Sequence, residues 1–181
     1  DGHFFRGHTI MVVGGSDAAC EEADFLTRYA EKVYLVHRRD AFRASKIVQQ
    51  RVFANPKIEI IWDTVVEEIV GGTDGLMTHA RIRNRATGTT SDLTATGIFI
   101  FIGFTPNTGM IEGHVEHDSA GYLITDSTMA TSIPGLFAAG DVRAQLTRQV
   151  TTAVGDATTA AIAAEKYLVA LKDRQPAGSA A

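Results

Sequence analysis

A strand that runs directly into a glycine pair and then into a helix is the feature that most constrains this sequence. Residues 9–13 (TIMVV) form an apolar, β-rich run typical of a buried parallel strand, and Gly14-Gly15 follows at once. Residues 18–29 then carry apolar side chains at helical spacing, and residues 32–36 (KVYLV) predict a second strand. The order strand, turn, helix, strand predicts a βαβ unit and an α/β fold.

Apolar patterning and breaker residues predict the remaining elements. The first part should continue with a helix at 44–53, a strand at 58–61, a small meander at 65–70 and 78–84, and one long strand or a strand pair at 93–102. The second part should hold short strands at 121–126 and 136–140 and a long alanine-rich helix at 150–171. Residues 174–181 are expected to form a disordered tail.

The glycine turn has the chemistry of a Rossmann-type dinucleotide site. In the pattern G-x-G-x-x-G/A, the first glycine permits a tight turn and the middle one lets the backbone approach a pyrophosphate. Ser16 replaces that middle glycine here, whereas Ala19 keeps the small residue that lets the helix pack on the strand. The alternative is a plain strand-to-helix turn. The residues expected to line the pyrophosphate are Gly14, Gly15, Ser16, Asp17 and Ala18.

A basic group follows the second predicted strand, where NAD-binding folds usually place an acidic residue to hold the ribose hydroxyls. The sequence has His37-Arg38-Arg39 at this point and Arg43 a few residues later. Guanidinium groups bind a phosphate through paired N–H donors, so we expect NADPH rather than NADH at this corner. The alternative is a solvated basic cluster, in which His37 is an ordinary surface or helix-cap residue.

The composition narrows the partners and the compartment. Asp and Glu outnumber Lys and Arg by 21 to 17, which does not favour nucleic acid or an anionic membrane as a partner. No apolar run is long enough to span a bilayer, and no signal segment opens the chain. Cys20 is the single cysteine, so no internal disulfide can form and a cytoplasmic setting is expected. We expect Cys20 to be a buried structural thiol, and we assign no metal ligand or catalytic residue.

Taken together, these motifs resemble the low-molecular-weight thioredoxin reductases, and the resemblance extends in order along nearly the whole chain. The glycine turn and the basic corner carry it first, in residues 12–23 (VVGGSDAACEEA) and 37–45 (HRRDAFRAS). Residues 102–108 (IGFTPNT) resemble the family's crossover between its two domains. Residues 134–142 (PGLFAAGDV) and 148–153 (RQVTTA) resemble its C-terminal flavin-binding segment.

The resemblance implies an NADPH-binding domain at residues 1–103 and the C-terminal segment of an FAD-binding domain at residues 104–173. It implies hydride transfer from NADPH to FAD and then electron transfer to a disulfide of thioredoxin or a similar small protein, by a homodimer. Residues with implied cofactor contacts beyond the first domain's motifs are Gly103, Asn107, Gly140, Asp141, Arg148, Gln149 and Val150.

Two departures from the family pattern leave alternatives open. The Cys-x-x-Cys pair, which in relatives comes just before an Asp-Gly followed by aromatic residues, is not among these residues, and neither is the N-terminal half of the FAD domain. We therefore expect a fragment that is inactive alone. A ferredoxin–NADP reductase of the thioredoxin-reductase-like type would lack a cysteine pair upstream of Asp1. A non-catalytic NADP(H)-binding module would lack flavin absorbance.

Overall fold

The computed structural model describes residues 1–174, and these fall into two compact units, Asp1–Gly103 and a second that begins at Phe104. The helix predicted at the end of the chain continues through Arg174. The rest of the predicted tail lies outside the described residues. Unit 1 denotes Asp1–Gly103, and unit 2 denotes the described residues from Phe104 onward.

Unit 1 is built on a four-stranded parallel sheet in the order β3-β2-β1-β7. The strands span Thr9–Gly14 (β1), Lys32–Val36 (β2), Ile58–Ile61 (β3) and Ile98–Phe101 (β7). The chain places β2 on one side of β1 and later returns to place β7 on the other. This reversal opens a crevice at the carboxyl end of β1, the position where such sheets bind ligands.

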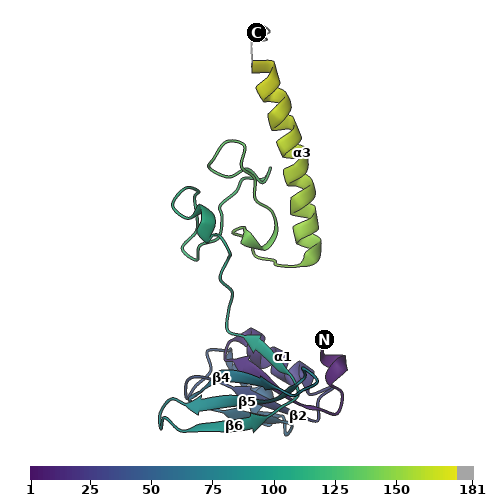
Figure 1. The fold of residues 1–181 in the computed structure, drawn as a ribbon, viewed down its shortest axis with the longest axis vertical. Helices are drawn as coiled ribbons and strands as arrows, with labels where there is room; N and C mark the ends of the chain where they lie inside the picture. Colours follow the sequence, from purple (N-terminus) through teal and green to yellow (C-terminus); the bar gives the residue numbers. More distant parts are fainter. Residues whose placement is uncertain (175–181) are drawn as a thin grey trace. The chain divides into compact units, whose positions relative to one another are not determined.

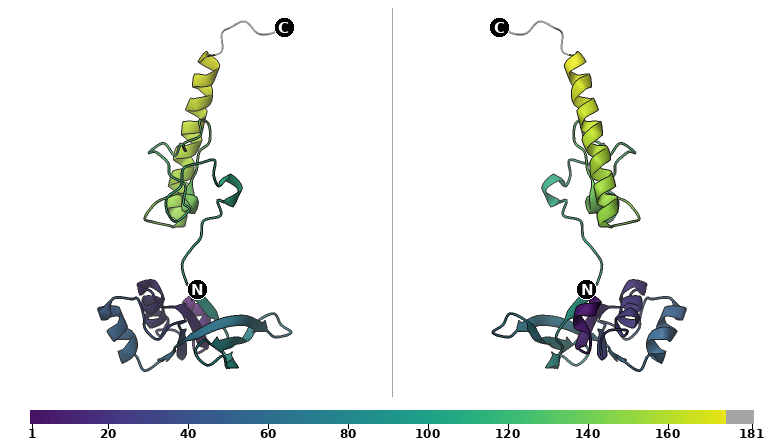
Figure 2. Two further views of the ribbon diagram at one scale, coloured as in Figure 1. Left: turned by 90° about the vertical axis from the view of Figure 1, so that its left-hand side faces the viewer. Right: turned by 90° about the vertical axis from the view of Figure 1, so that its right-hand side faces the viewer.

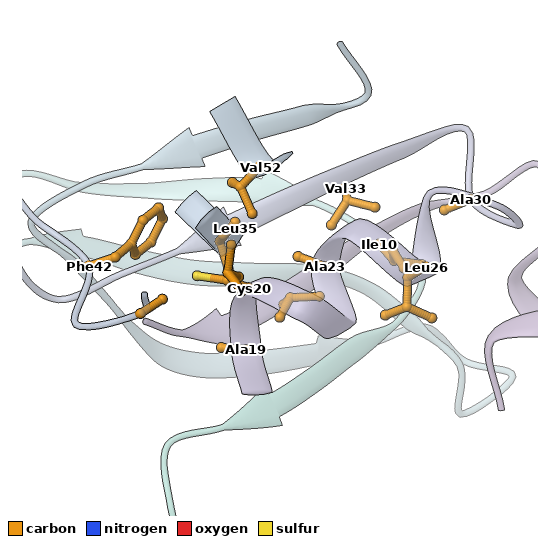
Figure 3. Close-up of a cluster of buried hydrophobic side chains, with 13 residues drawn as sticks. Ile10, Ala19, Cys20, Ala23, Leu26, Ala30, Val33, Leu35, Phe42 and Val52 are labelled. Carbon is orange, nitrogen blue, oxygen red and sulfur yellow. The ribbon is translucent and has the colours of Figure 1, made fainter. Parts of the chain in front are cut away.

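One face of this sheet is covered by α1 (Asp17–Leu26) and α2 (Lys46–Ala54). Side chains alternate along a strand, and Ile10 and Val12 accordingly point to the helices. Figure 3 shows this core, in which Ala19, Cys20, Ala23 and Leu26 of α1 pack against Ile10, Val33 and Leu35 of the sheet. The small residues of α1 let the helix approach the strands closely.

The other face of the sheet is covered by a three-stranded antiparallel meander (Figure 2). Its strands are Thr64–Gly71 (β4), Met77–Asn84 (β5) and Thr90–Thr94 (β6). Met11 and Val36 of the parallel sheet pack here against Ala80 and Ile82 of the meander. Helices, sheet and meander form three layers, which confirms the predicted α/β class. A short 3-10 helix, Gly2–Phe5 (η1), precedes β1.

Residues 93–102, expected as one long strand or a pair, belong to two strands in different sheets. β6 pairs with β5 of the meander, and β7 pairs with β1 of the parallel sheet. Between them the chain crosses from one layer to the other, with Ala95 buried and the Thr96 amide donating to the Thr9 carbonyl over 3.0 Å. Residues 93–102 therefore contribute to two layers of unit 1, the meander and the parallel sheet.

Unit 2 contains two short 3-10 helices, Gly109–Ile111 (η2) and Gly140–Val142 (η3), and the long helix α3, Val150–Arg174 (Figure 1). Its small core is formed by Val115, Leu123 and Ala138.

The short strands predicted at 121–126 and 136–140 are wrong. Leu123 and Phe137 form only isolated bridges within the described residues. The carboxylates of Asp118 and Asp126 accept the amides of Tyr122 and Ala130, at 2.9 and 3.0 Å, which turns the chain instead of extending it.

Candidate functional site

A cleft of about 690 Å³ lies at the carboxyl ends of β1, β2 and β7 in unit 1. Its apolar wall comes from strand ends such as Val13, Val36 and Ile100, and β4 contributes residues 64–69 to the lining. Its polar groups come from the glycine turn, from the start of the basic corner and from Thr64, Glu67 and Glu68 of β4. A concave, mostly apolar cleft with a few polar groups is the usual form of a cofactor site.

Both glycines of the turn are required by close contacts within the protein. A Cβ at Gly14 would lie 2.5 Å from the Phe101 carbonyl oxygen and 2.6 Å from the Cβ of Ala19. A Cβ at Gly15 would lie 2.2 Å from Cε1 of His37. The first glycine thus lets α1 pack against β1 and β7, and the second makes room for the imidazole.

His37 is a buried side chain and not the surface or cap residue of the alternative interpretation. Its Nε2 lies 3.1 Å from the Ala41 carbonyl oxygen, and its ring packs against Phe42 and Trp62 at centroid distances of 5.5 and 6.2 Å. Burial lowers its pKa, which favours the neutral imidazole. His37 therefore fixes the corner loop against the glycine turn, and the amide of Arg43 adds a 2.8 Å bond to the Gly15 carbonyl.

The start of α1 faces the cleft through Ser16, its N-cap residue, whose side chain makes no capping hydrogen bond. The first amides of a helix have no partner within the helix and attract anions. The carboxylate of Asp17 is engaged elsewhere, because its Oδ1 accepts the amide of Ser45 at the start of α2 over 2.8 Å. This hydrogen bond lowers the pKa of Asp17.

The basic corner presents guanidinium groups without acidic partners. Arg38, Arg39 and Arg43 are exposed, and within residues 1–173 none of them has a carboxylate oxygen within 4.0 Å. The arginines of the meander differ, since Arg81 pairs with Glu68 and Asp92, and Arg83 pairs with Glu67. A cluster of unpaired cations beside a cleft is suited to binding a phosphate.

One further basic residue at the corner was not anticipated from the sequence. Arg85 follows β5, and its Nη1 donates to the Arg38 carbonyl oxygen over 3.1 Å. The two residues are 47 positions apart in the chain, so no local pattern could have joined them.

The structure brings together most, but not all, of the residues predicted in unit 1. Those that line the cleft are Gly14, Gly15, Ser16, His37, Arg38, Arg43 and Gly103. Asp17, Ala18 and Arg39 are exposed but lie outside the cleft lining.

In unit 2, the Gly140–Asp141 turn is held at the first turns of α3. Asp156 of α3 accepts the Gly140 amide over 3.1 Å, and its Oδ2 also lies 2.7 Å from Nη1 of Arg143. Gln145 donates to the Gly140 carbonyl over 3.0 Å. A Cβ at Gly140 would lie 3.3 Å from the Cβ of Ala153, so the turn lies directly against the helix. The Asp141 side chain remains exposed.

The segment that opens α3 contains the other predicted residues. The Arg148 guanidinium carbon lies 4.0 Å from the centroid of the Tyr122 ring, and its Nε is a buried donor without a hydrogen-bond partner among the described residues. Gln149 and Val150 are exposed, and the Gln149 amide donates to the hydroxyl of Thr152 over 3.1 Å. Asn107 is also exposed, and no hydrogen bond within residues 1–174 joins it to these groups.

Three further features bear on what the described residues can do. Within residues 1–174, no group of three or more His, Cys, Asp or Glu residues is arranged to hold a metal ion. None of the helices in this range is both long enough and apolar enough to cross a membrane. Cys20 is buried, and burial raises the pKa of its thiol to about 11.

Comparison with known proteins places this architecture in a family. The family described as pyridine nucleotide-disulphide oxidoreductase matches residues 5–157, most of the chain. The chain belongs to this family. The match includes the glycine turn and the basic corner of unit 1, and in unit 2 the Gly140–Asp141 turn and the opening of α3.

Similar proteins in the family are thioredoxin reductases. Thioredoxin reductase 1, mitochondrial, of Arabidopsis thaliana is 49% identical over 173 residues, which are 94% of this chain and 46% of the plant protein. Thioredoxin reductase of Rickettsia conorii is 50% identical, over 93% of this chain and 55% of the bacterial one. The crystal structure of thioredoxin reductase from Streptococcus pyogenes matches 94% of this chain and 55% of its own, with 50% identity and a TM-score of 0.78. The chain thus spans about half the length of these relatives.

Proposed function

We propose that unit 1 binds NADPH, with the pyrophosphate at the glycine turn and the 2′-phosphate at Arg38, Arg39 and Arg43. The observation that carries the proposal is the set of unpaired guanidinium groups where the cleft meets the end of β2. NADH lacks the 2′-phosphate, so these charges favour NADPH alone. The residues present fit the cofactor, because anion-binding amides and an apolar cleft lie beside the same corner.

We further propose that unit 2 supplies part of an FAD site. Its residues fit the cofactor: Asp141 is exposed at the end of a fixed turn, and the orphaned Nε of Arg148 needs an acceptor. In this proposal Asp141 accepts hydrogen bonds from ribityl hydroxyls, and Arg148, Gln149 and Val150 bring the amides at the start of α3 to the polar edge of the flavin ring. Gly103 and Asn107 belong to the crossover between the two sites.

The activity proposed for the whole protein is NADPH-dependent reduction of a disulfide in thioredoxin or a similar small protein. When bound, NADPH supplies a hydride and FAD passes its two electrons to a disulfide. The chain's own contribution is to orient both cofactors and to neutralise the phosphates of NADPH. Its one thiol, Cys20, is buried in the core of unit 1, so the disulfide chemistry is not assigned to it.

The remaining parts of the proposal concern assembly and location. We propose a homodimer in the cytoplasm with no nucleic-acid or membrane partner. The excess of acidic residues, 21 against 17 basic ones, supports the absence of nucleic acid. A reduced, buried Cys20 is compatible with a reducing compartment. Sedimentation equilibrium of the protein at its natural length tests the dimer.

The cofactor proposal is tested by calorimetric titration of the 181-residue chain with NADPH and NADH. Arg38→Ala should weaken NADPH binding by about ten-fold or more, which is the cost of losing one charge-assisted contact, about 1.5–3 kcal/mol. Binding of NADH should change little. Equal losses for both cofactors, or no preference in the unaltered chain, would contradict the proposal.

The activity is tested separately on the protein purified at its natural length. Its absorbance reports bound flavin, and NADPH oxidation is followed with oxidised thioredoxin as acceptor. The proposal expects turnover that depends on thioredoxin. Bound flavin with no thioredoxin-dependent turnover would favour a related flavoenzyme with another acceptor.

A further inference from the structure

Arg85 lies on the meander but contacts the basic corner. It follows the end of β5, and its Nη1 donates to the Arg38 carbonyl oxygen over 3.1 Å. Its side chain is exposed, and within residues 1–173 no carboxylate oxygen lies within 4.0 Å of it. The guanidinium group of an arginine carries about five N–H donors, and the bond to Arg38 uses one of them. Arg85 therefore keeps charge and donors for an anion.

The backbone around Arg85 is tied to the corner by several hydrogen bonds. The amides of Asp63 and Thr64 donate to the carbonyls of Arg39 and His37, over 3.2 and 2.9 Å, and the Arg85 amide donates to the Asp63 carbonyl. Asp63 adopts a left-handed backbone conformation, with φ of 51°, which turns the chain sharply beside the corner.

The turn that follows Arg85 is itself fixed. The side-chain oxygen of Asn84 accepts the amides of Ala86 and Thr87, each over 3.0 Å. The backbone of Arg85 and one donor of its guanidinium are thus already fixed by hydrogen bonds. An arginine restrained in this way loses less conformational freedom when it binds a ligand.

The distribution of charged side chains at the corner favours an anionic ligand. Four guanidinium groups, those of Arg38, Arg39, Arg43 and Arg85, belong to one corner without a salt bridge, while Arg81 and Arg83 of the same meander are paired. Unpaired like charges repel one another, and a phosphate dianion among them relieves the repulsion. The neighbouring acids Asp40 and Asp63 form no ion pair with these groups.

We propose that Arg85 is the fourth cation of the 2′-phosphate site and a specificity-determining residue for NADPH over NADH. This inference rests on the proposed function and adds to it a residue from the other sheet. The meander is then more than a cover for the parallel sheet, because it also takes part in choosing the cofactor.

The test compares variants of the 181-residue chain in titrations with NADPH and NADH. Arg85→Gln should raise the Kd for NADPH about three- to ten-fold, between the effect of an exposed charge pair and that of a charge-assisted hydrogen bond. The Kd for NADH should stay the same, and Arg85→Lys should recover part of the loss. The matched control is Arg28→Gln, which also removes one positive charge. Arg28 follows the C-terminal end of α1, where its guanidinium lies over the ring of Phe25.

Salt dependence gives a second measurement that does not depend on absolute affinity. The affinity for NADPH should fall less steeply with salt in Arg85→Gln than in the unaltered chain, because one cation fewer meets the phosphate. Unchanged NADPH binding and salt slope would overturn the role of Arg85. If Arg85→Gln weakened the binding of NADH as much as that of NADPH, and Arg85→Lys did not restore it, Arg85 would have only a structural role. If the unaltered chain itself showed no preference for NADPH, the proposed function would fail first.

Discussion

The imidazole of His37 occupies the space that a side chain at residue 15 would need, since a Cβ at Gly15 would lie 2.2 Å from its Cε1. The glycine turn and the basic corner are therefore one packed assembly. His37 packs on Phe42 and Trp62 and faces the Ala41 carbonyl, and the ring cannot move aside without disturbing the loop that carries the arginines.

Gly15→Ala should destabilise unit 1 and weaken both NADPH and NADH. Forcing a methyl group against a packed ring costs about 1–3 kcal/mol, and the displaced loop changes both phosphate positions. Urea unfolding followed by the fluorescence of Trp62, the only tryptophan, measures the free energy of unfolding. In a His37→Ala background the cost of Gly15→Ala should shrink, because the ring is gone. Additive costs in this double-mutant cycle would mean that the two residues do not compete for space.

Sequence patterns predicted unit 1 well, because its signals are local. The run 9–13 ends at a glycine pair, and the structure places β1 at Thr9–Gly14 with α1 starting at Asp17. The small residue Ala19 predicted a helix packed closely on the strand, and Ala19 is buried in the core between α1 and the sheet. The pattern could not show why Gly15 is a glycine, because the reason is a contact with His37, which lies in the next strand's loop.

Unit 2 was harder to predict from patterns. Apolar residues such as Leu123 and Phe137 resemble strand residues, but a strand requires a partner over several residues. Within residues 1–174 each of these two residues forms isolated bridges only. The side chains that decide the local structure are Asp118 and Asp126, which bind nearby amides. The network around Asp156 also escaped prediction, because it joins a turn to a helix across 16 residues.

Ser16→Gly should leave dinucleotide binding unchanged or make it tighter. Ser16 stands where the usual pattern has a glycine close to the pyrophosphate, and its hydroxyl makes no capping bond to α1. The loss of stability should be only a few tenths of a kcal/mol, because glycine is an acceptable N-cap residue. Calorimetric titration with NADPH measures the effect. Weaker binding would show that the hydroxyl is itself a phosphate ligand.

Cys20 should react very slowly with iodoacetamide in the folded protein. Burial raises its thiol pKa to about 11, so little thiolate is present near neutral pH, and the side chain is fully buried among Ala19, Ala23 and Leu35 (Figure 3). Mass spectrometry after timed alkylation should show rapid modification only in denaturant. Cys20→Ala should keep NADPH binding unchanged. Fast labelling of the native chain would mean that α1 opens readily.

Asp156→Asn should loosen the Gly140–Asp141 turn of unit 2. The carboxylate accepts the Gly140 amide and pairs with Arg143, and both partners of this pair are mostly buried, with 12% and 13% of their side chains exposed. Loss of a charge-assisted, largely buried contact should cost about 1–3 kcal/mol. Hydrogen exchange of α3 amides, resolved by mass spectrometry, should become faster while that of α1 amides stays the same. Asp173→Asn, an exposed acid on the same helix, is the matched control.

The same carboxylate predicts how unit 2 responds to acid. The hydrogen bond from Arg143 lowers the pKa of Asp156 below its usual 3.8. A group whose folded pKa is lowered stabilises the fold above its unfolded pKa, and that stabilisation is lost as the pH falls through the folded value. Protection of the α3 amides against hydrogen exchange, corrected for intrinsic exchange rates, should therefore decline below about pH 4. In Asp156→Asn this decline in protection should be shallower. The part of the decline that remains is expected from Asp126, whose pKa is lowered by its hydrogen bonds to Thr128. An unchanged decline in Asp156→Asn would assign the acid sensitivity to other carboxylates.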